Sequence, residues 1–171
     1  MPLLVRAAEL GDCQSIARIY NQGIEERIAT FEVAHRTGRD IEKWFDGRHP
    51  IIVGEINSKV VGFASTSVYS DRECYNGISE FSVYVDRENR GSGIGRQLME
   101  TLIREAENVG FWKLVSRIFV ENLQSRALMA KLGFREVGIY EKHAQLDKKW
   151  KNVVIVELLL SRDLVQEHET T

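Results

Sequence analysis

The segment from Glu80 to Arg104 constrains the fold of this chain most, because it combines a strand pattern, a glycine cluster and a helix pattern. Hydrophobic and polar residues alternate from Phe81 to Asp86, the period of two that predicts a β-strand. The sequence Arg90-Gly91-Ser92-Gly93-Ile94-Gly95 follows, and hydrophobic residues then recur at helical spacing from Leu98 to Ile103. The segment therefore predicts a strand, a glycine turn and a helix in direct succession.

A helix that begins at such a turn presents unpaired backbone N–H groups and the positive end of its dipole. This arrangement binds anions, typically phosphate or pyrophosphate, and glycine lets the ligand approach the backbone closely. Two other nucleotide motifs are excluded. A P-loop needs Lys-Ser or Lys-Thr after the glycines, which this chain lacks. A Rossmann fingerprint needs Gly-x-Gly-x-x-Gly in the first βα unit, whereas this chain has Gly91-x-Gly93-x-Gly95 in mid-chain.

Hydrophobic periodicity also predicts the other elements. Further strands are expected at 3–8, 51–56, 60–68, 113–120, 134–146 and 150–160. Further helices are expected at 13–28, with Asp12 as a candidate N-cap, at 40–47 and at 121–132. The resulting order, β-α-α-β-β-β-α-β-α-β-β, predicts an α/β fold on a mixed sheet, mostly antiparallel in its first half and with one central βαβ crossover.

Length and composition suit one domain and exclude several functional classes. The 171 residues contain no linker, which predicts a single domain over 1–171, with a core over about 3–160 and a frayed polar tail at 162–171. A net charge of −2 argues against nucleic acid or an anionic membrane as partner, and no apolar run reaches transmembrane length. The first residues lack a signal-peptide pattern, and Cys13 and Cys74 show no metal-binding spacing. We therefore expect a cytoplasmic protein with reduced cysteines and no metal.

The motif Arg90-x-x-Gly93-x-Gly95, between the strand Ser82-Val83-Tyr84-Val85 and an amphipathic helix, resembles the acyl-CoA loop of the GNAT acetyltransferase superfamily. The predicted element order is that of the GNAT fold over roughly residues 3–160. The stretches IARIYNQGI, HPIIVGE, VVGFASTS and ENLQSRALMAKLGFREVG are similar to the phosphinothricin N-acetyltransferase branch, whose relatives act on methionine sulfoximine and sulfone. IEERIATFE, GFWKLVSRIFVEN and GIYEKH most resemble its arsinothricin-resistance members.

This resemblance implies an antibiotic-resistance enzyme that uses acetyl-CoA to acetylate the α-amine of a small amino-acid-like toxin. Transfer would be direct, in a ternary complex, and the family usually forms homodimers. The implied acetyl-CoA site has three parts. The strand would bind the pantetheine arm through its backbone, the turn would bind the pyrophosphate, and the start of a later helix would bond the pantetheine or acetyl region. The residues in these roles are Val83, Tyr84 and Val85; Arg90, Gly91, Ser92, Gly93, Ile94, Gly95 and Arg96; and Asn122 with Ser125.

Simpler interpretations of these residues stay open. The strand alternation is equally that of a plain core strand, Arg90 is nearly as well explained as a solvated arginine, and Asn122 as a helix N-cap.

An amine must lose a proton before it attacks a thioester, and a nearby carboxylate can accept that proton. Glu80, which alternates with Ser82 on the predicted strand, matches the glutamate assigned as general base in the phosphinothricin branch. An exposed strand carboxylate is the alternative. The backbone N–H near Val83 would polarise the thioester carbonyl.

The tyrosine that serves as general acid in many relatives is replaced here by Met129. A thiolate leaves without help more readily than most groups, so no acid is strictly required. Tyr84, Tyr140 and His143 are the candidate substitutes.

The implied acceptor is a zwitterion with an extra acidic or polar group, so cations are expected around it. The predicted acceptor residues are Phe31, Glu32, Arg72, Tyr75, Glu80, Phe81 and Ser82. Arg72 is the main candidate for the anionic groups, with a solvent-facing loop charge as the alternative. Many members have a further arginine where this chain has Ser70, which favours methionine sulfoximine or another amino acid over a doubly anionic acceptor.

Three other functions remain in competition. A polyamine or a protein N-terminus is another possible acceptor, although such acceptors favour an acidic groove and this loop offers Arg72. A non-catalytic acyl-CoA-binding sensor would share the cofactor site without turnover. A dinucleotide oxidoreductase is the remote third choice.

Overall fold

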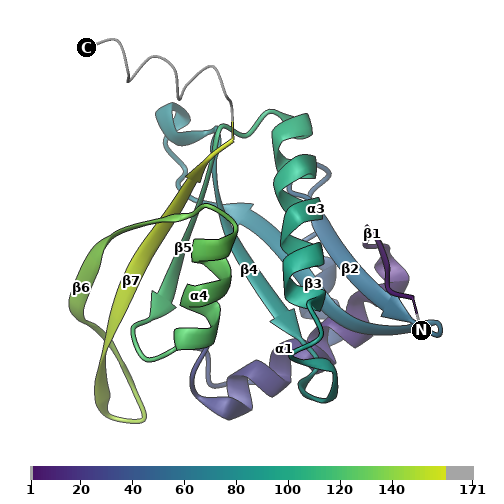
Figure 1. Cartoon of the computed structure of the whole chain (residues 1–171), viewed down its shortest axis with the longest axis horizontal. Helices are drawn as coiled ribbons and strands as arrows, with labels where there is room; N and C mark the ends of the chain where they lie inside the picture. Colours follow the sequence, from purple (N-terminus) through teal and green to yellow (C-terminus); the bar gives the residue numbers. More distant parts are fainter. Residues whose placement is uncertain (1, 161–171) are drawn as a thin grey trace.

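A seven-stranded mixed sheet with strand order β1-β2-β3-β4-β5-β7-β6 forms the centre of the computed structural model, which describes residues 2–160 (Figure 1). The strands are β1 Leu4–Ala7, β2 Ile51–Ile56, β3 Lys59–Val68, β4 Ile78–Val85, β5 Lys113–Phe119, β6 Arg135–Leu146 and β7 Lys149–Leu159. The helices are α1 Cys13–Glu26, α2 Gly38–Glu42, α3 Ile94–Val109 and α4 Leu123–Lys131. The polar tail expected at 162–171 lies outside the described residues.

The predicted order of strands and helices and the mixed α/β sheet are confirmed. Among the strands of residues 2–160, only β4 and β5 pair in parallel, and α3 makes the crossover between them. The second helix differs from its prediction over 40–47. It begins at Gly38, because the Thr37 hydroxyl and the Asp40 carboxylate cap each other's backbone N–H groups, and it ends at Glu42.

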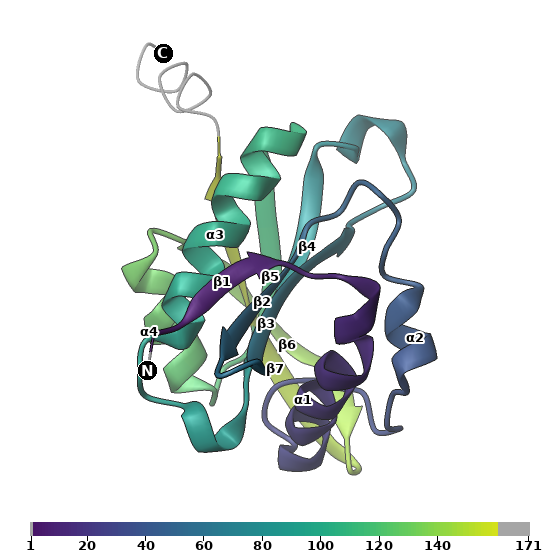
Figure 2. The ribbon, with the colours of Figure 1, turned by 90° about the vertical axis from the view of Figure 1, so that its right-hand side faces the viewer.

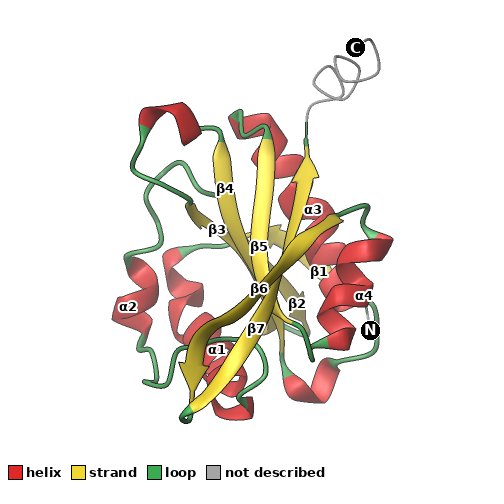
Figure 3. Ribbon diagram, turned by 90° about the vertical axis from the view of Figure 1, so that its left-hand side faces the viewer, coloured by secondary structure: helices red, strands yellow, loops and turns green. Residues whose placement is uncertain are grey.

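Helices cover both faces of the sheet. Figure 2 shows α3 on one side of the strands and α1 with α2 on the other. One buried cluster joins α3 and α4 to the sheet through Leu98, Leu102 and Met129, and a second joins α1 and α2 through Ile16 and Ile41. Towards β5, β7 and β6 the face on the α1 side carries no helix among the described residues (Figure 3).

The side chains of β4 divide between these two faces as the alternation predicts. Phe81, Val83 and Val85 pack into the cluster beneath α3, whereas Tyr84 packs into the cluster beneath α1. Glu80 and Ser82 therefore point to the α1 side of the sheet, where β5 is not covered.

Strands β4 and β5 pair over a short stretch and then separate. Their parallel pairing is limited to Ile78–Glu80 against Lys113–Val115. Beyond it β4 stays paired with β3 as far as Val85, and β5 stays paired with β7 as far as Phe119. Figure 1 shows the two strands diverging towards their carboxyl ends. The sheet therefore contains a wedge-shaped opening just past Glu80.

None of the helices in residues 2–160 combines the length and apolar character needed to cross a membrane.

Candidate active site

The glycine turn has the backbone conformation that an anion site requires. Gly91 and Gly93 have φ of +79° and +81°, and Gly93 is the N-cap of α3. A Cβ on either would meet nothing within 4 Å, so both face open space. A Cβ on Gly95 would lie 3.3 Å from Leu128, so this glycine instead lets α3 approach α4. The first N–H groups of α3 therefore lie next to two positions, Gly91 and Gly93, at which no side chain obstructs a ligand.

A cleft of about 840 Å³ lies between this turn, β4, α1 and the start of α4. Every residue predicted for the acetyl-CoA site lines it except Ser92, whose hydroxyl donates to the Asn89 carbonyl at 2.7 Å. Gly23, Glu26 and Ile28 of α1 and the loop after it complete the wall. The structure thus brings the predicted turn, strand and helix residues together around one opening.

The backbone of β4 offers unpaired groups to this opening. Asp86 donates to the Val61 carbonyl at 2.8 Å, and antiparallel strands exchange such bonds at every second pair. Tyr84 and Ser82 are therefore bonded to β3, and the backbone groups of Val83 point towards β5 instead. Since β5 has diverged there, the described residues offer Val83 no ladder partner on that side. A ligand arm carrying amides fits such an edge as an added strand.

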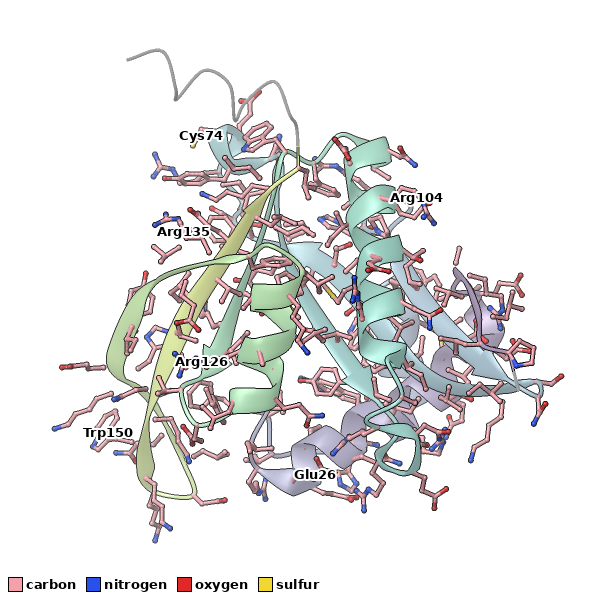
Figure 4. The ribbon with its side chains drawn as sticks, in the orientation of Figure 1. Glu26, Cys74, Arg104, Arg126, Arg135 and Trp150 are labelled. Atoms are coloured by element: carbon pink, nitrogen blue, oxygen red, sulfur yellow. The ribbon has the colours of Figure 1, made fainter. Side chains whose placement is uncertain are left out.

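Both arginines of the turn are engaged within the chain. Arg90 donates to a Glu26 carboxylate oxygen at 2.8 Å and to the Val85 carbonyl at 3.1 Å. Arg96 pairs with Glu100 at 2.8 Å on the surface of α3. To bind a phosphate, either arginine would have to give up its ion pair with the neighbouring glutamate. Arg90 also fixes the turn against α1, as Glu26 projects from that helix (Figure 4).

Asn122 caps α4, which was the simpler of its two interpretations. Its side-chain oxygen accepts from the Ser125 N–H at 3.2 Å, and its amide donates to the Ile28 carbonyl at 3.4 Å. Both residues still line the cleft, so the cap does not exclude a ligand contact. Met129 is 1% exposed in the core under α4, so this position presents no acid to the cleft.

Glu80 lies at the base of the wedge and bonds a residue that the sequence interpretation missed. Its carboxylate accepts from the Arg117 guanidinium at 2.9 Å across the two diverging strands. The Glu80 side chain is 35% exposed and that of Arg117 is 51% exposed. A signal for Arg117 existed, since it is a charged residue within the hydrophobic strand Lys113–Phe119.

Aromatic residues line part of the α1 side of the wedge. The Phe31 ring packs edge-on against Phe119, with centroids 4.7 Å apart, and Tyr84 packs edge-on against Tyr20 at 5.2 Å. Burial raises the pKa of Tyr84 and that of Tyr20, so both phenols are protonated at neutral pH. Of the three suggested substitute acids, only Tyr84 lines the cleft. Tyr140 and His143 contact each other on the exposed strand β6.

The remaining predicted acceptor residues are distributed unevenly. Ser82 is exposed beside Glu80, and Glu32 pairs with Arg36 at 2.9 Å. The Phe81 side chain is buried against Phe134, and its carbonyl accepts from the Ser116 hydroxyl at 3.0 Å. An acceptor would therefore meet Phe81 through its backbone only.

Arg72 and Tyr75 lie in the loop 69–77, at the start of β4. They contact each other, with the guanidinium carbon 5.6 Å from the ring centroid, and both are exposed. Cys74 of the same loop lies at the opposite end of the molecule from Glu26 (Figure 4). The cation that the structure brings to Glu80 is Arg117, not Arg72.

Within residues 2–160 there is no group of three or more His, Cys, Asp or Glu side chains arranged to hold a metal ion.

Comparison with known proteins gives the same family by three routes. Residues 16–134 match the acetyltransferase (GNAT) family model. The chain is 30% identical to the L-methionine sulfoximine/L-methionine sulfone acetyltransferase of Pseudomonas paraeruginosa, over 94% of this chain and 96% of that protein. Among solved structures, it is 31% identical to a ribosomal-protein-alanine N-acetyltransferase from Brucella melitensis, with a TM-score of 0.87 over 91% of this chain and 99% of that one.

A further neighbour was solved with the donor bound. This is a GNAT superfamily phosphinothricin acetyltransferase from Sinorhizobium meliloti in complex with AcCoA, 26% identical, with a TM-score of 0.87 over 94% of this chain and 90% of that one. The turn, the wedge and the cleft fit such a donor, and the resemblance first indicated by the glycine motif is confirmed. The chain belongs to the GNAT family of acetyl-CoA-dependent acetyltransferases.

Proposed function

We propose that this protein acetylates the α-amine of a small amino acid that carries a second acidic or strongly polar group. Phosphinothricin, arsinothricin and methionine sulfoximine are acceptors of this type, and resistance to such toxins would be the consequence. The observation that supports the proposal most is the wedge past Glu80, where a carboxylate and a guanidinium stand together at the opening towards Val83. The names of two relatives point to the same class of acceptor.

In this mechanism acetyl-CoA supplies the acetyl group as a thioester. Glu80 takes a proton from the acceptor's ammonium group, directly or through water. The freed nitrogen forms a bond to the carbonyl carbon, the bond to sulfur breaks, and CoA leaves as a thiolate, which takes up the second proton that the nitrogen loses as the amide forms. The N–H of Val83 stabilises the oxyanion that forms in between.

A direct transfer in a ternary complex is favoured by the positions of the cysteines. Cys13 is buried in α1 and Cys74 lies in the loop 69–77, so neither lines the cleft as a nucleophile. Both are free thiols, which suits the reducing cytoplasm that we propose as the compartment.

A protein N-terminus is the second candidate acceptor. It is favoured by the likeness to a ribosomal-protein-alanine N-acetyltransferase, which is 31% identical. A peptide acceptor has no carboxylate next to its amine, so Arg117 argues against it.

We further propose a homodimer that uses the β6–β7 hairpin. β6 is an edge strand exposed along nearly its whole length, and it carries the apolar side chains Val137, Ile139 and Tyr140. Trp150 on β7 is also exposed and projects outward from the hairpin (Figure 4). An exposed edge strand with apolar side chains is typical of a surface that pairs with another chain.

The test is thiol release from acetyl-CoA with phosphinothricin, arsinothricin, methionine sulfoximine, methionine sulfone, glutamate, spermidine and an alanine-initiated peptide. We expect turnover with at least one of the first four. Glu80→Gln should lower kcat by roughly 100-fold or more, the usual contribution of a general base, with an unchanged affinity for CoA. Glu136→Gln, which alters an exposed glutamate paired with Arg126, is the control and should keep full activity.

Two outcomes would contradict the proposal. Turnover of the peptide or of spermidine alone would replace the acceptor class. CoA binding without turnover of any amine would identify a sensor.

A further inference from the structure

We propose that Arg117 binds the acceptor's α-carboxylate, and that this exchange of ion pairs releases Glu80 to accept the proton. The inference rests on the proposed function, which it deepens by naming the residue that recognises an amino acid as opposed to a simple amine. It assigns a role to a side chain that the glycine motif and its resemblance did not include.

The register of the two strands aims Arg117 at Glu80. The last residue of β5 that pairs with β4 is Val115, opposite Glu80. Leu114 and Ile118 of β5 pack beneath α3 and α4, so alternation turns Arg117 to the other face, where Phe119 meets Phe31. Arg117 therefore stands across the opening from Glu80, on the same side of the sheet.

Arg117 is the available cation on this open face. Lys113 of β5, Arg135 of β6 and Lys151 of β7 also lie on this face, where Lys151 is over the Phe119 ring. Lys113 and Arg135 are both bound to the one carboxylate of Glu157 at 2.5 Å, and Lys151 is bound to Glu121 at 2.5 Å. Figure 4 shows Arg135 away from the wedge, on the far side of β7. The only carboxylate bound to Arg117 in residues 2–160 is Glu80, and this pair is half exposed.

The charges of the acceptor match this pair. An α-amino acid brings a carboxylate and an ammonium group on one carbon. The carboxylate forms a bidentate contact with a guanidinium, and the ammonium group then meets the carboxylate of Glu80. One ion pair is replaced by two, and Glu80 no longer shares its charge with Arg117. An amine without a carboxylate leaves Glu80 bound to Arg117 and is a poor acceptor.

The test compares methionine sulfone with 3-(methylsulfonyl)propan-1-amine, which is the same molecule without its carboxylate. We expect wild-type protein to prefer methionine sulfone in kcat/KM. Arg117→Gln should lower kcat/KM for methionine sulfone by roughly 100-fold, the size expected for a lost charge pair, while changing that for the plain amine by less than about 3-fold. The KM for acetyl-CoA should not change. Arg117→Lys should recover part of the loss, since it keeps the charge but not the bidentate contact.

The matched control is Arg135→Gln, which removes another exposed, carboxylate-paired arginine from the same face and should leave the preference for methionine sulfone intact. Thermal unfolding of each variant identifies any loss of fold. If Arg117→Gln is destabilised, Arg117→Lys replaces it in the comparison of the two acceptors. An equal loss on both acceptors, or no loss on either, would overturn the proposal. Calorimetric binding of methionine sulfone in the presence of CoA separates the two hypotheses. If methionine sulfone binds only when Arg117 is present but is not acetylated, the proposed function alone is contradicted. If methionine sulfone binds equally well to the Arg117→Gln variant, this inference is contradicted.

Discussion

Asp12 shows how a single carboxylate can serve two neighbouring elements. Its position before α1 predicts an N-cap, but its side chain makes no capping bond to α1. The two oxygens instead accept from Arg6 of β1 at 2.8 and 3.0 Å, and one also accepts from the Glu9 N–H at 2.8 Å. The Arg6 hydrogen bonds lower the pKa of Asp12, although burial opposes them. Arg6 also bonds Glu55 of β2, so this cluster joins β1 to the rest of the sheet.

Replacing Asp12 by Asn should destabilise the protein by about 1–3 kcal/mol, the usual contribution of hydrogen bonds to a charged group. A group whose pKa is lowered by folding stabilises the fold above its unfolded pKa, and this contribution is lost as pH falls through the folded pKa. The difference in unfolding free energy between wild type and variant should therefore be full above about pH 4 and shrink below it. Urea unfolding between pH 7 and pH 2 measures it.

Asp71→Asn, in an exposed loop without a described ion pair, is the control. A difference that persists unchanged at low pH would mean that the charge of Asp12 does not contribute.

At this same scale the sequence predicted the donor side better than the acceptor side. The residues around Gly91 and Val83 are contiguous in the chain, so their motif describes one local structure. Glu80 and Arg117 are 37 positions apart and meet only because β4 and β5 are parallel neighbours. Arg72 was the predicted cation because the implied acceptor needs cationic groups and the loop 69–77 offers this arginine, which in the structure contacts Tyr75. Pairing of strands, not sequence distance, decided which arginine faces the carboxylate.

At the scale of elements, α3 begins and ends on glycines with positive φ, and only one end faces the cleft. Gly93 is its N-cap, with φ of +81°, and Gly110 is its C-cap, with φ of +104°. Neither position would place a Cβ within 4 Å of another residue. A side chain would therefore introduce similar backbone strain at both glycines, and the two positions differ in that Gly93 lines the cleft.

Gly93→Ala and Gly110→Ala should each destabilise the fold by about 1 kcal/mol, because alanine resists the left-handed conformation. Only Gly93→Ala should weaken acetyl-CoA binding, by roughly 10-fold, because it displaces N–H groups at the positive end of the helix. Calorimetric titration with CoA and thermal unfolding of both variants separate the two effects. Equal loss of affinity in both variants would show that helix stability, and not the turn, governs donor binding.

The strands and helices themselves were predictable because their hydrophobic patterns are long and regular. The exception was α2, where Trp44 and Phe45 suggested a helix through 47. These aromatic side chains instead follow the helix in a turn and pack on the second core cluster. Because α2 has only five residues, with its N-cap at Thr37, it is too short to show a helical hydrophobic periodicity in the sequence.

At the scale of the whole molecule, one edge of the sheet stands out. α1 and α2 cover β2 to β4, whereas the hairpin of β6 and β7 extends beyond them with apolar side chains in solvent. Neither the hydrophobic pattern nor the glycine motif indicated this exposure, since the apolar residues of an exposed edge strand have the same spacing as those of a buried strand.

The proposed homodimer predicts a mass of twice 19.6 kDa by light scattering. Trp150→Glu should shift the protein towards the monomer, because it places a charge on a side chain that is 55% exposed in the isolated chain and buried at the proposed interface. Leu10→Glu, at a position 64% exposed before α1, is the control and should leave the mass unchanged. A monomeric wild type, or a Trp150→Glu variant that keeps the wild-type mass, would refute this interface.

The separation of β4 from β5 also bears on how acceptor preference can change over time. In the proposed site the donor is bound by main-chain groups of Val83 and by the glycine turn, and most substitutions on the α1 face of β4 would leave these groups in place. The proposed acceptor contacts are mostly side chains, such as those of Glu80, Arg117 and Phe31. Substitutions on that face can therefore change which amine is acetylated while the affinity for acetyl-CoA stays the same.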